Sequence, residues 1–333
     1  MHKIGKTILF DEPPVIIGNA GVVGKKEGEG PLAKDFDAIF EDTTLGQTSY
    51  ELAESAMLHD AIIRGLTSAG ISAKDVDFVL SGDLLDQCMG SAFAIKDLEI
   101  ASIGLFGACS TMALSLTVGS MLVSAGAKNV VCATSSHFCS SERQFRFPLE
   151  YGGQRPPSSQ WTVTGAGSAI VSNKGKGIKI KAIQVGTITD LGVTDANNMG
   201  AAMAPAATRT IGDFLTDTKT KPCDYDLIVT GDLGYTGSEL LYQLMKKEYN
   251  IDLKPYHNDC GKMIYNLKEQ DVNSGGSGCG CGASVLCSHI IKNMKKGRLK
   301  KVLFVATGAL MSPTSSKQGN SIPGIAHAVL LEV

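Results

Sequence analysis

The chain has 333 residues, of which 31 are basic and 33 acidic, and its formal net charge is −2. This balance supplies no general positive field for nucleic acid or an anionic membrane, so we expect no nucleic-acid partner and only a local anion site. The length predicts two packed halves or one large α/β unit with a sizeable core.

The sequence also indicates the cellular compartment of the protein. Residues 1–10 do not have the pattern of a secretory signal, and the longest apolar stretch, residues 112–127, is too short for a transmembrane segment. Nine cysteines without framework spacing predict reduced thiols. Cys279 and Cys281 lack a second ligand pair, so no metal site is expected there. We therefore expect a cytosolic chain.

The first predicted elements alternate between helix and strand. Thr48 and Glu51 form a capping box for an amphipathic helix that ends near Gly70. Residues 75–80 are β-rich and predict a buried parallel strand, and residues 100–106 predict another. This alternation is typical of an α/β protein.

Further regular elements surround a long irregular segment. A helix is predicted from about residue 109 to 125, followed by a strand at 128–134. Residues 140–162 are rich in arginine, proline and glycine, which favours a long functional or interface loop. Residues 161–171 and 178–189 predict an antiparallel pair across a glycine-containing turn.

The second half begins near Asp190 and repeats the order of elements. A helix is predicted from Pro205 towards residue 215, and residues 225–230 predict a strand. Thr236 and Glu239 then cap another helix.

A duplication is also visible in the residue identities. Residues 76–84 match residues 225–233 at an offset of 149, with four of nine positions identical. Residues 107–134 can be aligned with residues 278–306 at an offset of 172. Two copies related in this way predict duplicated halves, which we place at 1–189 and 190–333.

Cys109 is the first candidate functional residue. A strand, the segment 107–111 and an apolar helix place this cysteine at a helix N-terminus after a sharp turn. The free N–H groups and the helix dipole there favour an anion, so we expect a lowered thiol pKa and a seat for a carboxylate or oxyanion. The alternative is a small buried thiol that packs under the turn.

These residues resemble the thiolase and β-ketoacyl synthase superfamily. Residues 107–111 resemble its nucleophile elbow, residues 199–207 look like the segment that opens its second half, and residues 324–332 are similar to its final strand. The resemblance implies an α/β thiolase-like fold, with two duplicated βαβαβαββ halves in a five-layered αβαβα arrangement. It also implies that Cys109 occupies the nucleophile position.

The catalytic partners of that superfamily do not match. A histidine is expected after the strand 226–230, where Gly231 and Asp232 stand, and a second histidine or an asparagine is expected in the turn 278–282. Loss of such donors costs on the order of 10² to 10³ in rate for each donor. We therefore expect a non-catalytic protein. The alternative is an active acyltransferase with Cys109 as nucleophile and His137 or His257 as base.

An ordered series of motifs is similar to a narrower family, the stage V sporulation protein AD family of spore-forming bacteria. The matching segments are 82–85, 105–111, 133–137, 142–146, 150–154, 202–207, 257–261 and 275–279. The resemblance implies binding of dipicolinic acid, free or as its calcium chelate, in the former active-site pocket, and support of its uptake into the developing spore. No cofactor of the protein itself is expected, and calcium is expected only as part of this chelate.

The same resemblance implies partners and a place in the cell. The expected partners are the other stage V sporulation A proteins at the spore inner membrane, and a homodimer is the family expectation. The expected location is peripheral, at the cytoplasmic face of the forespore or spore inner membrane.

A flat diacid needs donors at both ends and a small-walled slot between them. Cys109 and neighbouring amides can take one carboxylate, and the glycine-rich turn 275–282 leaves room. Asp83 and Asp232 lie at matching strand ends and suit calcium, a protonated acid or a role in fixing loops. The complete predicted ligand-binding set is Asp83, Leu84, Cys109, His137, Gly231, Asp232, His257, Gly276 and Cys279.

The two histidines of this set, His137 and His257, have an equal alternative, and two arginines outside the set are further candidates. His137 directly follows a strand, where ligand contacts are common, but a histidine hydrogen-bonded within its loop is an equal interpretation. Arg143 and Arg146 can supply ligand charge, although loop arginines are more often solvated or ion-paired.

Overall fold

The computed structural model describes residues 1–145 and 155–333, and its strands form one long mixed sheet path. The order along this path is β12-β11-β14-β15-β10-β3-β9-β7-β5-β6. The strands are β3 (Val15–Gly24), β5 (Phe78–Gly82), β6 (Ser102–Gly104), β7 (Asn129–Ser136), β9 (Gly165–Ser172), β10 (Ile178–Gln184), β11 (Leu227–Thr230), β12 (His257–Asp259), β14 (Lys301–Ala309) and β15 (Gly324–Glu332).

The path divides into two sheets of identical design. In the first, β5 is parallel to β6 and β7, β9 is antiparallel to β7, and β3 is antiparallel to β9. In the second, β11, β12 and β14 are parallel, and β15 and β10 follow in the same way. Among the strands of residues 1–145 and 155–333, a short β3–β10 pairing joins the two sheets. Strand β10 occupies the position in the second sheet that β3 occupies in the first, so the strand order assigns β10 to the second sheet. The predicted boundary between the two halves of the chain, after residue 189, stays a prediction.

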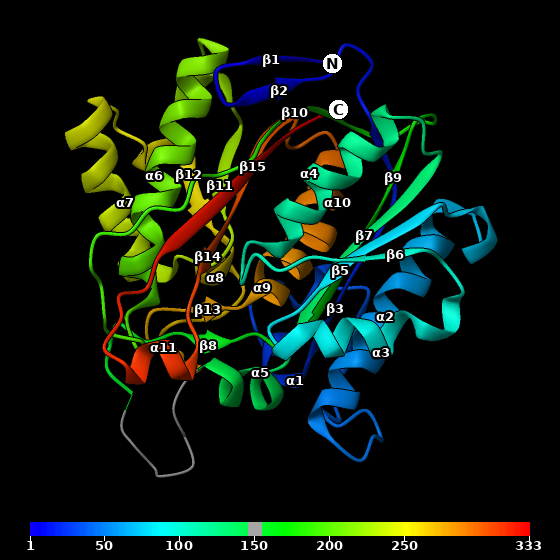
Figure 1. Ribbon diagram of the computed structural model, residues 1–333, viewed down its shortest axis with the longest axis horizontal. Helices are drawn as coiled ribbons and strands as arrows, with labels where there is room; N and C mark the ends of the chain where they lie inside the picture. Colours follow the sequence, from blue (N-terminus) through cyan, green and yellow to red (C-terminus); the bar gives the residue numbers. More distant parts are fainter. Residues whose placement is uncertain (146–154) are drawn as a thin grey trace.

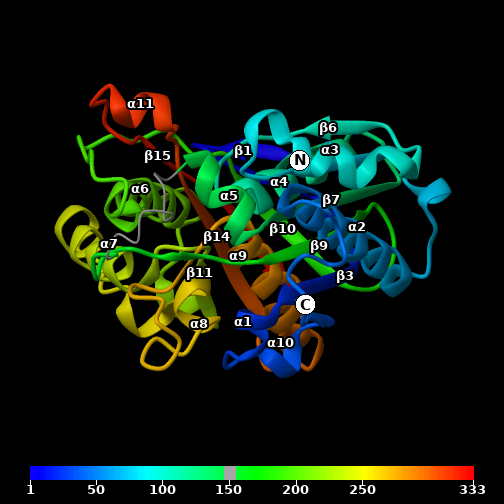
Figure 2. The same ribbon diagram turned by 90° about the horizontal axis from the view of Figure 1, so that it is seen from below.

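Helices complete five layers (Figures 1 and 2). Helices α2 and α3 cover the outer face of the first sheet, α6 and α7 cover the outer side of the second, and α4 contacts both sheets between them. Helix α9 lies beside α4 in this middle layer. The bounds are α2 (Tyr50–Ala69), α3 (Met89–Ile95), α4 (Thr111–Ser124), α6 (Met199–Thr218), α7 (Gly234–Tyr249) and α9 (Cys279–Val285), which continues through a π-helical turn (Leu286–Ile290) into α10 (Ile291–Lys295). This arrangement confirms the predicted fold class.

Smaller elements fill the connections. The short helices are α1 (Lys25–Gly28), α5 (Phe138–Phe145), α8 (Cys260–Met263) and α11 (Pro313–Lys317), with 3₁₀ turns at Ala33–Asp35, Ala73–Asp75, Asp86–Cys88, Lys96–Leu98, Pro222–Asp224 and Lys254–Tyr256. The short strands are β1 (His2–Ile4), β2 (Thr7–Leu9), β4 (Ala38–Phe40), β8 (Trp161–Thr162) and β13 (Gly276–Ser277). Within the described ranges, no helix is both long and apolar enough to cross a bilayer.

Close approach of α9 to the first sheet requires glycine. A Cβ on Gly167 of β9 would lie 2.3 Å from the carbonyl oxygen of Ala283, and a Cβ on Gly280 would lie 2.3 Å from that of Gly165. Real side chains do not tolerate such distances, so these glycines let the middle layer pack directly on the strands.

Two predicted helix starts are wrong. The cap of α2 is Ser49, whose hydroxyl accepts a hydrogen bond from Leu52 N at 3.3 Å, and not Thr48. Helix α6 begins at Met199 with Asn198 as its cap, so Pro205 lies inside the helix and does not start it. Burial of almost the whole helix face outweighs the cost of the proline.

The cap predicted for α7 is also wrong, because Thr236 lies within the first turn of a helix that begins at Gly234. The carboxylate of Asp259, far along the chain, accepts hydrogen bonds from Leu233 N and Gly234 N at 2.8 and 2.9 Å. A tertiary contact therefore replaces the local cap, and spacing alone does not indicate such a contact.

The predicted hairpin between β9 and β10 does not form. Strand β3, which was not predicted from the sequence, lies between them and pairs with both. The segment 140–162, predicted as a loop, contains the end of α5 and the strand β8, which pairs with β13. Arg146 and the motif 150–154 lie outside the described residues.

Candidate functional site

Cys109 lies in a tight turn between β6 and α4. The turn is closed by hydrogen bonds from Ser110 Oγ to Gly107 O at 2.5 Å and from Thr111 Oγ1 to Ala108 O at 2.6 Å. Ala108 adopts φ +48°, a left-handed conformation that a residue with a side chain rarely adopts. The helix begins at Thr111, two residues later than predicted, so Cys109 precedes the helix and is only 5% exposed.

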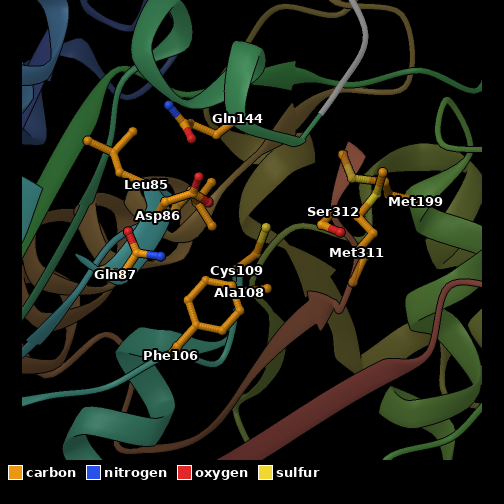
Figure 3. A pocket seen from close by; sticks show the side chains of 12 residues that line it. Leu85, Asp86, Gln87, Phe106, Ala108, Cys109, Gln144, Met199, Met311 and Ser312 are labelled. Atoms are coloured by element: carbon orange, nitrogen blue, oxygen red, sulfur yellow. The ribbon is translucent and has the colours of Figure 1, made fainter. Parts of the chain in front are cut away.

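A pocket of about 290 Å³ opens above this turn. In Figure 3, Leu85, Asp86, Gln87 and Gln144 lie on one side, Met199, Met311 and Ser312 lie on the other, and Cys109 lies between them. The described lining residues are Leu84, Leu85, Asp86, Gln87, Phe106, Ala108, Cys109, Gln144, Met199, Ala309, Met311 and Ser312. The pocket is therefore built by both halves at the carboxyl ends of their strands, where open α/β sheets bind ligands.

Asp232 is buried directly beside the thiol of Cys109. Its carboxylate accepts hydrogen bonds from Gly278 N at 2.9 Å and Thr307 Oγ1 at 2.8 Å, and it also interacts with the thiol. Burial raises the pKa of Asp232 to about 7, against the opposing effect of these hydrogen bonds. Asp232 thus supports the pocket floor and is not one of its described lining residues.

The predicted lowering of the Cys109 pKa is wrong. Burial raises this thiol pKa well above its usual value, and the negative charge of Asp232 raises it further. The turn places Cys109 before the helix, where these effects outweigh the dipole. The residue is therefore held as a neutral thiol.

Asp83 occupies the same position in the first half but binds different groups. Its carboxylate accepts hydrogen bonds from Leu85 N at 2.8 Å and Ser91 N at 2.6 Å, which fixes the loop that forms one pocket wall. The neighbouring Glu54 accepts hydrogen bonds from Ser135 and Ser140. Burial raises the pKa of both carboxyl groups. Of the predicted roles for Asp83, fixing the loop is the one that these contacts support.

Neither predicted histidine lies among the described residues of the pocket wall. His137 Nε2 contacts Thr43 O at 2.8 Å, and its Nδ1 accepts a hydrogen bond from Cys139 N at 3.1 Å. The contact with Cys139 lies within the loop of His137, as the alternative interpretation predicted, whereas the contact with Thr43 joins the ring to the segment before α2.

His257, the first residue of β12, forms part of a buried chain of hydrogen bonds that links β12 to β11 and α7. Its Nδ1 contacts the Tyr242 hydroxyl at 3.0 Å, and its Nε2 contacts Thr230 Oγ1 at 2.9 Å. Thr230 donates onward to Asp259 at 2.6 Å, so His257 Nε2 is the donor to Thr230. Burial lowers the pKa of His257 to about 3, which keeps the ring neutral. The ring therefore serves this network.

The remaining predicted residues lie around the floor. Cys279 donates from its thiol to Ser135 O at 2.8 Å and packs against Leu84, Ala108 and Cys109. Gly231 donates its N–H to Val305 O, and Gly276 O accepts from Gln160 Nε2 at 2.8 Å. The structure thus gathers Leu84, Cys109, Asp232 and Cys279, while Gly231 and Gly276 belong to neighbouring backbone pairings.

Most of the pocket walls were not predicted from the sequence. Asp86 and Gln87 come from a turn without a recognised pattern, and Met311 and Ser312 follow the last residue of β14. Phe106 lies in the matching segment 105–111 but was not predicted to bind the ligand. Arg143, a candidate for ligand charge, forms an ion pair with Glu51 at 2.5 Å instead. No cluster of potential metal ligands occurs in residues 1–145 and 155–333.

Comparison with known proteins decides the family. Residues 5–332 match the family model "Stage V sporulation protein AD (SpoVAD)". The chain is also 43% identical to stage V sporulation protein AD of Bacillus subtilis (strain 168), over 100% of this chain and 98% of that protein. The chain belongs to the stage V sporulation protein AD family. It is thus a sporulation protein, as the ordered motifs predicted.

Solved structures confirm the fold of this family member. The 3-oxoacyl-[acyl-carrier-protein] synthase III from Aquifex aeolicus VF5 aligns over 96% of this chain and all of its own, with 14% identity and a TM-score of 0.56. A variant of Xanthomonas campestris OleA with cerulenin aligns over 100% of both chains, with 11% identity and a TM-score of 0.62. At these identities the likeness shows a thiolase-like fold alone.

Replacing Asp232 by asparagine should make Cys109 more reactive. The substitution removes the negative charge beside the thiol, so the thiolate fraction and the rate of alkylation by iodoacetamide should rise on the order of tenfold. Peptide mass spectrometry measures this rate, with the exposed Cys223 as internal control. An equal Cys109 rate in both proteins would contradict the role given to Asp232.

The same substitution should change the pH dependence of stability. Because burial raises the Asp232 pKa from 3.8 to about 7, the folded chain keeps a proton over this range that the unfolded chain releases. This contribution to the free energy of unfolding is complete below about pH 4 and is lost as the pH rises to about 7, by on the order of 4 kcal/mol. Guanidinium unfolding should show that the free energy of unfolding falls less between these pH values for Asp232→Asn than for the wild type. An equal fall in both proteins would refute the raised pKa assigned to Asp232.

Proposed function

We propose that this protein binds dipicolinate, free or as its calcium chelate, in the pocket beside Cys109, and supports its uptake into the developing spore without catalysing acyl transfer. Membership of the stage V sporulation protein AD family over the whole chain carries this proposal. The pocket supports it, since the described lining contains no histidine or asparagine and its cysteine is held as a thiol.

The walls of the pocket suit a small flat diacid. Phe106, Met199 and Met311 offer apolar and polarisable surface to the faces of a ring. Gln87, Gln144 and Ser312 carry side-chain donors that can reach carboxylate oxygens at its edges. A few polar groups in a mainly apolar cavity are typical of a small-molecule site.

The charge of the pocket bears on the form of the ligand. Asp86 is the charged side chain among the described lining residues, and Asp83 and Asp232 lie behind the walls. Calcium prefers oxygen ligands, so the chelate can accept the Asp86 carboxylate, whereas the free dianion must rely on N–H and O–H donors. Both forms remain in the proposal.

The partners and location follow the family. We propose peripheral association at the cytoplasmic face of the forespore or spore inner membrane, together with other stage V sporulation A proteins. The proposal rests on family membership.

We also propose a homodimer built through the free edge of β6. Within the described ranges, β6 pairs on one side only, with β5. Exposed apolar side chains flank it, with Met89 42%, Phe93 44% and Phe106 55% exposed. Pairing of this edge in a second copy would cover both the unpaired backbone groups and this apolar surface.

Sedimentation velocity tests the dimer. The protein should sediment as a dimer, and Phe93→Glu should shift it to monomer because a charge would be buried in the contact. Ile188→Glu, at a similarly exposed apolar residue away from this edge, is the matched control. A monomeric wild-type protein would refute the dimer.

Calorimetric titration tests the ligand. Sodium dipicolinate and its one-to-one calcium chelate should each give saturable binding. Ala309→Phe, which fills the pocket from the end of β14, should weaken binding by at least about tenfold by steric exclusion. Asp86→Asn should weaken the chelate and strengthen the free dianion, because it removes one negative charge from the wall.

The controls separate a pocket effect from a folding effect. Ala125→Phe adds the same ring at an exposed position after α4 and should bind like the wild type. Benzene-1,3-dicarboxylate has the same carboxylate spacing without the ring nitrogen and should bind more weakly as a calcium complex. Absence of heat with either form of dipicolinate at millimolar concentration would sink the proposal.

Incubation with acyl-CoA addresses the alternative function. The neutral thiol of Cys109 should form no acyl adduct, and intact mass spectrometry should detect only unmodified chain. A stable acyl group on Cys109 with any chain length would instead establish an acyltransferase.

A further inference from the structure

A basic surface lies where several strands begin. It is formed by the turns that lead into β7, β10, β11 and β14. Its side chains are exposed and, as far as the described residues go, form no ion pair. These residues, called here the basic surface, are Lys128, Lys174, Lys176, Lys179, Lys219, Lys221, Lys296, Arg298 and Lys300.

Strand pairing places these residues at one end of the molecule. Lys179 of β10 and Lys301 of β14 both lie opposite Glu332 of β15. Lys300 O accepts a hydrogen bond from Val333 N, and Lys128 O accepts one from Asn173 N at the turn that carries Lys174. Residues far apart in sequence therefore contribute to one surface.

This surface and the pocket lie at opposite ends of the same strands. Strand β14 runs from Lys301 to Ala309, which lines the pocket. At about 3.3 Å for each residue, these ends are roughly 26 Å apart. In Figure 1 both chain termini lie at the end with β1 and β10, while α5 and α11, next to the pocket, lie at the other. Contact at the basic surface would leave the pocket open.

Several carboxylates near this end already have partners. Glu332 forms an ion pair with Lys301, and Asp11 pairs with the N-terminal ammonium and His2. Asp77 accepts a hydrogen bond from Lys128 N at 2.5 Å, Asp224 accepts one from Lys221 N at 2.7 Å, and Asp226 accepts from Lys300 N at 2.7 Å. These contacts fix the turns, while the nine basic side chains named above are exposed and form no ion pair with the described carboxylates. Because the whole chain carries a net charge of −2, the excess of positive charge here is local.

We propose that the basic surface docks this protein on an anionic lipid bilayer, with the pocket facing away from the membrane. Lysines outnumber arginine in the set, and lysine acts as a flexible point charge that suits headgroups more than it suits planar base edges. The set contains no aromatic residue that could stack on bases. Direct lipid contact goes beyond the proposed ligand binding and does not depend on it.

Vesicle co-sedimentation of the full chain tests this surface. The protein should pellet with vesicles of equal parts phosphatidylglycerol and phosphatidylcholine, should not pellet with phosphatidylcholine alone, and should be released at high salt. The triple variant Lys296→Glu, Arg298→Glu, Lys300→Glu should bind the anionic vesicles at least tenfold more weakly.

A matched control carries the same change in charge elsewhere. Lys25→Glu, Lys34→Glu, Lys268→Glu alters exposed lysines outside the basic surface and away from the β6 edge, and should pellet like the wild type. Both variants should bind dipicolinate equally, which shows that they are folded. If dipicolinate binding is absent from all three proteins while the vesicle results hold, only the proposed function fails. Equal vesicle binding by the two triple variants, or binding to duplex DNA but not to vesicles, would overturn the lipid proposal.

Discussion

The buried carboxylate of Asp232 is the interaction on which the site depends. It joins the start of α9 through Gly278 N, the end of β14 through Thr307 Oγ1 and the first half's turn through the thiol of Cys109. Loss of these donors would leave a buried carboxyl group without hydrogen-bond partners, which lowers the free energy of unfolding by about 1–3 kcal/mol or more. The same group therefore connects the two halves at the pocket floor, and burial together with its charge keeps Cys109 protonated.

The duplication explains both the likeness and the difference between the halves. Asp83 and Asp232 end equivalent strands, yet Asp83 binds the N–H groups of its own loop, while Asp232 reaches across to the other half. Identical strand order provides the frame, and the loops after the strands provide the chemistry. One thiolase-like frame can thus serve both this sporulation protein and a distant structural neighbour that is a 3-oxoacyl-[acyl-carrier-protein] synthase.

Sequence reasoning found the frame and the floor of the site better than its walls. The repeated Gly-Asp strand ends and the turn around Cys109 are local patterns, so two similar halves and the position of Cys109, Asp232 and Cys279 were predictable. The thiolase-like fold class was implied by the family resemblance of the motifs. The cap of α7 by Asp259 and the insertion of β3 between β9 and β10 are tertiary effects without a local signal. The thiol pKa was misjudged because burial and a carboxylate from the other half outweigh the helix dipole.

The location of the bound ligand tests the central claim most directly. Diffraction from crystals grown with dipicolinate should show the planar ring between the side of the pocket that carries Gln87 and Gln144 and the side that carries Met199 and Met311, above an unmodified Cys109. Electron density for the ligand at any other place, with this pocket empty, would contradict the account.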